Sequence, residues 1–219
     1  MRKVCEFGRS MVEMLGVLAI IGVLSVGGIA GYSKAMEKYK LNKFSSAFTQ
    51  LLASVIELNP RIESSISISN SVDASLLNTL NLVPEGMKYK APYIYDNFEN
   101  QMKYYYGYHN AGRTLESYFS IILSADGKKI SREKTQICNV ILNVVKENSE
   151  NILYIDKREH AEDSYSNYVL WGDSGCINNR KCLNKMTLDD VDNVCYSCSS
   201  EKRCTFMVYF SVKTFNVSS

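Results

Sequence analysis

The chain has little proline, little histidine and almost no net charge. Three prolines and two histidines occur among its 219 residues, and 25 basic residues nearly balance 23 acidic ones. Such a balance gives no reason to expect nucleic acid as the main partner, so we predict no sequence-specific nucleic acid binding. Fifteen tyrosines beside so few prolines favour a folded body with β-strands over a disordered chain. The length suits one domain plus an additional element.

Seven cysteines are present, and an odd total does not suit a framework of disulfides alone. Cys5 precedes a long apolar stretch. The other six follow it, as Cys138, Cys176, Cys182, Cys195, Cys198 and Cys204. Removal of the first few residues, Cys5 among them, would therefore leave an even number of cysteines.

The apolar stretch runs from Met14 to Gly31 and holds no charge in 18 residues. A helix of that length spans roughly 27 Å, close to a bilayer core of about 30 Å. Arg2, Lys3 and Arg9 precede it, which predicts a cytoplasmic N-terminus with the bulk of the chain across the membrane. A cleaved secretory signal, a single-pass anchor and the helix of a polymerising subunit are the competing interpretations.

The pattern after Gly31 argues against a secretory signal, which should end at a small-residue cleavage site. Apolar residues instead recur at alternating spacings of three and four, at Leu41, Phe44, Phe48, Leu51, Val55 and Leu58. This predicts one helix of roughly 49 residues from about Ser10 to Leu58, ending at Asn59-Pro60. Its first half is apolar all round, and its second half is amphipathic.

Glu13 lies at the cytoplasmic edge of the apolar run, five residues after Gly8. An ionised carboxylate against hydrocarbon is costly unless it is paired, and the alternative is that it stays among the lipid headgroups. Gly8, Glu13 and the run MLGVLAIIGVLSVGG resemble the prepilin signal of type IV pilins and type II secretion pseudopilins. The likeness covers about 30 residues, and the rest of the chain agrees only in general layout.

In that family a membrane peptidase cuts after the glycine. The resemblance therefore implies a leader of residues 1–8, cleavage between Gly8 and Arg9, and N-methylation of Arg9. It also implies an assembly role for Glu13, whose carboxylate would meet the amine of a neighbouring Arg9. Residues 9–31 would form the membrane and polymerisation half of the helix, 32–59 its amphipathic half, and 60–219 a globular head.

The remaining chain predicts an α+β fold. In it, the long N-terminal helix packs on a head with an antiparallel β-sheet, a second helix and a disulfide-rich C-terminal region. The second helix is expected from Ser131 to about Lys146, a short one at 74–82, and turns at 84–86 and 126–127. Extended segments are expected at Tyr89–Tyr108, Tyr118–Ser124, Ile152–Ile155, Tyr168–Trp171 and Thr205–Val212.

The cysteines from Cys176 to Cys198 have the spacing C-x5-C-x12-C-x2-C, which fits a zinc site, a redox pair or structural disulfides. A domain outside the cytoplasm favours disulfides, although six cysteines permit 15 pairings. We expect a local Cys176–Cys182 loop and a bond from Cys138 to the region Cys195–Cys204. The second bond resembles the one that closes the C-terminal loop of pilins.

Two other motifs have simpler interpretations than chemistry. Gly172-Asp173-Ser174-Gly175 is similar to the serine turn of trypsin-like proteases, but neither His109 nor His160 lies in a protease-like context, so a plain turn is expected. The second motif consists of three acids, Asp189, Asp190 and Asp192. They can bind calcium, or they can lie in the first turn of a helix that is capped by Thr187. We predict no catalytic residue, metal or cofactor.

These observations favour a structural subunit of a type IV pilus, with its head exposed for adhesion, aggregation, motility or uptake. Its partners would be identical or related pilin subunits, the prepilin peptidase and, before assembly, the inner membrane. The extracellular filament would be its final location. A pseudopilin of a type II secretion system and a membrane-anchored periplasmic binding domain are the alternatives.

Overall fold

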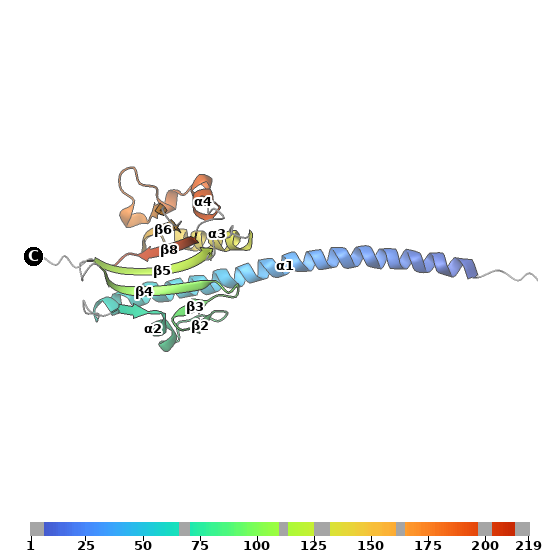
Figure 1. Cartoon of the computed structure of the whole chain (residues 1–219), viewed down its shortest axis with the longest axis horizontal. Helices are drawn as coiled ribbons and strands as arrows, with labels where there is room; N and C mark the ends of the chain where they lie inside the picture. The colour runs from blue at the N-terminus through green and yellow to red at the C-terminus, as the bar shows by residue number, and fades with distance from the viewer. Residues whose placement is uncertain are drawn as a thin grey trace, which may run out of the picture. The chain divides into compact units, whose positions relative to one another are not determined.

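The chain divides into two compact units, Met1–Asn42 and Lys43–Ser219, and we call the second the head. The computed structural model describes residues 7–65, 71–109, 114–124, 132–160, 165–196 and 203–212. One helix, α1 (Phe7–Glu63), contributes to both units and is coloured blue to cyan in Figure 1. The predicted combination of a long N-terminal helix with an antiparallel sheet is confirmed.

The predicted end of this helix at Asn59-Pro60 is wrong, because α1 continues through Pro60 to Glu63. Proline removes one backbone donor and crowds the preceding turn, at a cost of about 3 kcal/mol in a helix interior. The added turn contains Ile62, which is only 6% exposed. Burial of such a side chain contributes roughly 1.5–3 kcal/mol, which offsets much of that cost.

The sheet of the head has the strand order β2-β3-β4-β5-β8-β6-β7, and β1 pairs with β4 outside this path. All pairings between these strands are antiparallel. The strands are β1 (Ser71–Asp73), β2 (Lys88–Lys90), β3 (Tyr93–Tyr95), β4 (Gln101–His109), β5 (Thr114–Ser124), β6 (Ile152–His160), β7 (Tyr165–Trp171) and β8 (Arg203–Phe210).

The last strand, β8, lies between β5 and β6. Because β5 and β6 are both antiparallel to β8, they run in the same direction and need a crossover connection. That connection contains α3 (Arg132–Glu147), the second helix expected from the sequence. The expected cap at Ser131 and turn at 126–127 lie outside the described residues.

The shorter helices follow their caps. Helix α2 (Ala74–Thr79) begins after Asp73, whose side chain accepts a hydrogen bond from the Ser75 amide. Helix α4 (Leu188–Cys195) begins after Thr187, the predicted cap, which forms a capping box with Asp190. The 3-10 turns η1 (Asp173–Gly175) and η2 (Leu183–Lys185) complete the segment between β7 and α4.

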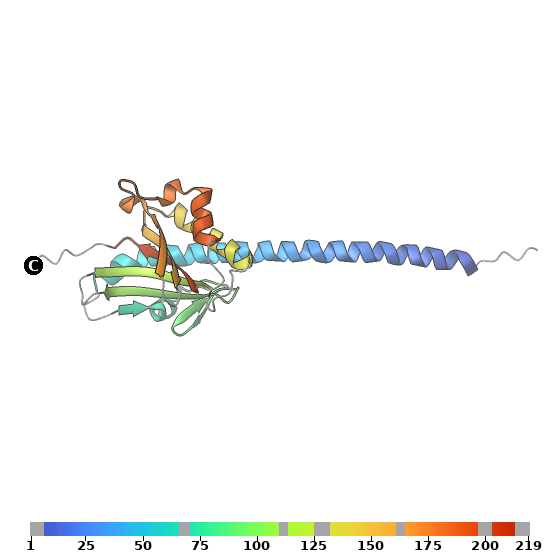
Figure 2. The same cartoon turned by 45° about the horizontal axis from the view of Figure 1, so that its top comes forward.

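The C-terminal part of α1 supplies much of the core of the head. Its amphipathic stripe is buried as predicted, with Phe48, Leu51, Leu52 and Val55 fully inaccessible. At its end, the Asn59 side-chain oxygen accepts hydrogen bonds from the hydroxyls of two strand residues, Tyr104 (2.9 Å) and Ser117 (3.1 Å). Figures 1 and 2 both show this end of α1 running along β4 and β5.

Strand register separates the sheet into two faces. One face carries Tyr104, Phe119, Val208 and Ile155, which pair across neighbouring strands and are buried. Helix α1 contacts this face through Asn59. We call the opposite side the open face, and it carries Tyr105, Tyr118, Tyr209 and Tyr154.

Candidate functional site

The N-terminal half of α1 presents apolar side chains to its surroundings. Eleven large hydrophobic residues between Met11 and Ile29 are 52% to 74% exposed. Water around so much apolar surface is unfavourable, and a contiguous exposed patch marks a surface that is covered by something else. Among the described residues, α1 alone is long and apolar enough to cross a membrane by length and composition.

Small residues interrupt this apolar surface. A methyl group placed on Gly16, Gly22, Gly27, Gly28 or Gly31 would meet nothing within 4 Å. Glycines on a helix surface allow a second helix backbone to approach closely. The half-helix is therefore suited to packing against other helices as well as against lipid.

The residues of the predicted prepilin signal lie at the start of α1. Gly8 and Arg9 fall within the helix, and Glu13 is exposed one turn later. Residues 1–6 of the predicted leader (residues 1–8) lie outside the described residues, and Cys5 is one of them. Glu13 is thus an accessible carboxylate at one end of an apolar helix surface.

The two expected disulfide connections are present in the head. Cys176 pairs with Cys182, and Cys138 in α3 pairs with Cys195 at the end of α4. Cys204 in β8 is also disulfide-bonded, whereas Cys198 lies outside the described residues. Because Cys176, Cys182 and Cys195 are in disulfide bonds, they offer no thiolate to a zinc ion. Cys195 pairs with Cys138, so it does not form the redox pair that was considered for the C-x2-C motif.

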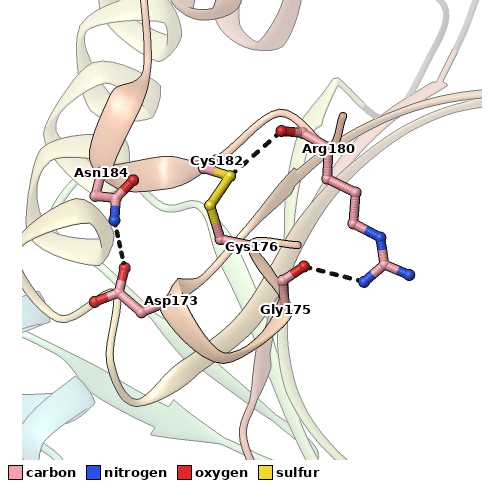
Figure 3. The surroundings of a disulfide bond; sticks show 6 residues. All are labelled: Asp173, Gly175, Cys176, Arg180, Cys182 and Asn184. Atoms are coloured by element: carbon pink, nitrogen blue, oxygen red, sulfur yellow. Dashed lines mark hydrogen bonds between the residues drawn. A yellow bond between two sulfur atoms is a disulfide. The ribbon is translucent and has the colours of Figure 1, made fainter. Parts of the chain in front are cut away.

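The local disulfide holds a compact turn after β7, shown in Figure 3. The Asp173 carboxylate accepts a hydrogen bond from the Asn184 side chain at 2.9 Å, and the Arg180 guanidinium donates to the Gly175 carbonyl at 3.0 Å. The Gly172–Gly175 motif forms η1, the turn predicted in place of a catalytic serine. The Ser174 hydroxyl lies 3.4 Å from that of Ser211.

Of the three acids considered for calcium, Asp190 has structural partners instead. Its carboxylate accepts hydrogen bonds from the Thr187 amide and hydroxyl at 2.7 Å and from the Tyr168 hydroxyl at 2.6 Å. Burial alone would raise the pKa of Asp190, but hydrogen bonds from Tyr168, Thr187 and Lys181 hold it well below its usual range. In the described part of the chain, no group of three His, Cys, Asp or Glu residues is arranged to hold a metal ion.

Sequence reasoning missed a row of aromatic side chains on the open face of the sheet. The aromatic row consists of Tyr105, Tyr118, Tyr209, Tyr154 and Trp171, in spatial order across β4, β5, β8, β6 and β7. Each member was visible as an aromatic residue in a predicted strand. Their alignment depends on strand order and register, which no local pattern specifies.

No family model, curated protein or solved structure matches this chain.

Proposed function

We propose that this chain is a non-enzymatic structural subunit of a type IV pilus, polymerised through the N-terminal half of α1. The observation that carries the proposal is the contrast within one helix. Its first half exposes apolar side chains, whereas its second half is buried in the core of the head. An exposed apolar helix is stable only against lipid or against other apolar helices.

The two environments would follow one another. Before assembly, the apolar half spans the inner membrane with Arg2, Lys3 and Arg9 on the cytoplasmic side and the head in the periplasm. After cleavage between Gly8 and Arg9, copies leave the membrane and pack their helices together. The glycines of the apolar half allow these helices to approach closely.

Glu13 would set the axial register of the packed helices. In a helix bundle its carboxylate is removed from water and needs a positive partner. The amine at the cleaved N-terminus of a neighbouring Arg9 supplies one. Loss of one partner from such a buried pair costs about 3–5 kcal/mol, enough to prevent assembly of subunits that are held in this register.

The decisive experiment compares Glu13→Ala with the matched variant Glu37→Ala, which removes an acid further along the same helix. We expect Glu13→Ala to be cleaved normally yet to yield no filaments in sheared surface material. Glu37→Ala should yield normal filaments. Normal piliation of Glu13→Ala would refute the register role.

N-terminal sequencing of the mature protein tests the processing step. A start at Arg9 is expected. A start near Gly31 would indicate a secretory signal, and an intact Met1 would indicate a permanent anchor for a periplasmic binding domain. If the chain starts at Arg9 but electron microscopy finds no surface filaments, the pseudopilin alternative replaces the pilus subunit.

A further inference from the structure

The aromatic row crosses five strands on the open face of the head. The ring centroids of successive members are 5.3, 5.2, 4.4 and 5.0 Å apart. Their planes are inclined to one another by 27° to 54°. Contacts this close leave no room for a base or ring to insert between them. The row therefore acts as one continuous surface of ring edges and hydroxyl groups.

The tyrosines of the row present neutral hydroxyls at physiological pH. Burial, together with the nearby Glu116 carboxylate, raises the pKa of Tyr154 to about 12. Burial likewise raises the pKa of Tyr105, Tyr118 and Tyr209. Tyr209 is nearly inaccessible, whereas Tyr105, Tyr118, Tyr154 and Trp171 remain half-buried. The half-buried members keep part of their surface available for a ligand.

An ion pair lies beside the centre of the row. Arg158 Nε contacts Asp156 Oδ2 at 2.5 Å, and Arg158 Nη2 donates to the Tyr209 hydroxyl at 2.7 Å. Asp156 is only 3% exposed, and its second oxygen, Oδ1, is enclosed without a hydrogen-bond partner among the described residues. An enclosed carboxylate cannot itself meet a ligand, so Arg158, whose side chain is 30% exposed, is the member of the ion pair that a ligand can reach.

A cation lies at the far end of the row. The Arg180 guanidinium stacks on the Trp171 ring, 3.9 Å from its centroid. It is held there by the Gly175 carbonyl, as Figure 3 shows. Together with Arg158, it places donors at two points along the aromatic surface.

The charges on this face discriminate between ligand classes. Nucleic acid binding relies on a groove with an excess of positive charge that follows the phosphates. Here the Glu116 and Asp156 carboxylates lie close enough to raise the pKa of Tyr154. They lie among cations of the same face, which are Arg158, Arg180 and the exposed Lys103 beside Tyr105. Charges of both signs beside aromatic rings suit an uncharged ligand that carries many hydroxyls and has apolar patches to contact aromatic carbon.

We infer that the open face of the head binds a neutral glycan. Sugar rings would lie along the aromatic row, and their hydroxyls would accept hydrogen bonds from Arg158 and Arg180. A hexose has hydroxyls on its rim and C–H groups on its faces, which matches this combination of groups. The Tyr118 and Tyr154 rings, half-buried and central, supply most of the apolar contact.

Trp171 is the single tryptophan of the chain, so its fluorescence reports on the row alone. The full chain in detergent micelles is titrated with four uncharged oligosaccharides: maltohexaose, cellohexaose, laminarihexaose and mannohexaose. An oligothymidylate and heparin serve as anionic probes. We expect a saturable change in Trp171 emission with at least one uncharged oligosaccharide and none with either polyanion.

Variants locate the site. Tyr118→Ala should weaken binding by roughly tenfold or more, and Tyr118→Phe, which keeps the ring, should weaken it less. Asp156→Asn removes the charge that positions Arg158 and should also weaken binding. Tyr196→Ala is the matched control, since Tyr196 is an exposed tyrosine that directly follows α4, a helix that bonds to the opposite face of the sheet. Circular dichroism verifies that each variant is folded.

Several results would overturn the inference. One is that Trp171 emission changes with none of the four oligosaccharides, and another is that it changes with a polyanion alone. A third is that binding of the oligosaccharide is insensitive to both Tyr118→Ala and Asp156→Asn. A Trp171 signal that depends on protein concentration alone would assign the face to a second copy of the chain. The assay uses solubilised subunits, so its outcome is independent of whether the chain polymerises.

Discussion

At the scale of single residues, Asp190 connects α4 to the sheet. Its carboxylate completes the capping box with Thr187 and accepts the Tyr168 hydroxyl from β7. We expect Asp190→Ala to lower the free energy of unfolding by about 2 kcal/mol, because a cap and a charge-assisted hydrogen bond are lost together. Urea unfolding at neutral pH measures the change. Asp189→Ala, which removes an exposed acid of the same turn, should stay within about 0.5 kcal/mol of the wild type.

The lowered pKa of Asp190 also predicts a pH dependence. The contribution of this carboxylate is complete above its unfolded-state pKa of about 4 and is lost as the pH falls below that value toward the folded-state pKa. The difference in stability between the wild type and Asp190→Ala should therefore shrink below about pH 4. A difference that stays constant down to pH 2 would show that the charge contributes nothing.

Asn59 is a second residue whose partners define a prediction. It is buried, and its side-chain oxygen accepts from both Tyr104 and Ser117. Asn59→Ala should cost about 2 kcal/mol, and Tyr104→Phe, which removes one donor and leaves the other paired, about 1 kcal/mol. Thermal unfolding of the two variants provides the comparison. Equal losses would mean that Asn59 is not the centre of this network.

At the scale of secondary-structure elements, two of the disulfides of the head should stabilise the fold to different extents. Cys138–Cys195 joins α3 to α4 across 57 residues, and Cys176–Cys182 closes a loop with a separation of 6. On loop-closure entropy alone, the long loop stabilises the fold by about 4 kcal/mol and the short one by about 2 kcal/mol. Denaturation of Cys138→Ala/Cys195→Ala and Cys176→Ala/Cys182→Ala should reproduce that order. The reverse order would show that native-state contacts, and not chain entropy, dominate.

Local patterns predict elements better than they predict arrangement. The stripe from Phe44 to Val55 and the cap at Thr187 are local signals, and both helices that they predict are present. The position of β8 between β5 and β6 was not predicted, because strand pairing is decided by contacts distant in sequence. The continuation of α1 beyond Pro60 depends on the burial of Ile62, which likewise is known only from the packed structure.

The candidate site has two parts, the apolar run with Glu13 and the aromatic row, and only the first could be located from the sequence. Glu13 and the apolar run could be located from sequence, because charge and hydropathy along one helix are local properties. The aromatic row could not, since its members come from five strands and align only through their register. A surface made by a sheet is invisible to sequence patterns until the pairing of its strands is known.

At the scale of the whole molecule, the boundary between the units lies within α1. The predicted head began at residue 60, whereas the compact unit begins at Lys43. The difference matters because the buried residues of α1 begin at Phe44 and include Phe48, Leu51 and Leu52. Each of these side chains contributes roughly 1.5–3 kcal/mol by burial. Together they approach the whole stability of a typical domain, about 5–15 kcal/mol.

Two truncations of the chain test where the independent folding unit begins. A fragment of residues 43–219 retains the buried stripe of α1 and loses the exposed apolar half, so it should be soluble without detergent and unfold cooperatively. A fragment of residues 60–219 lacks the stripe and exposes the sheet face that it covers, so it should aggregate or bind hydrophobic dyes. Light scattering with circular dichroism distinguishes the two outcomes, and the full chain in detergent provides the reference spectrum. If the 60–219 fragment is soluble and unfolds cooperatively, α1 is only an attachment to the head. If that fragment aggregates or binds hydrophobic dyes, the helix that is proposed to hold subunits together also completes the core of each subunit.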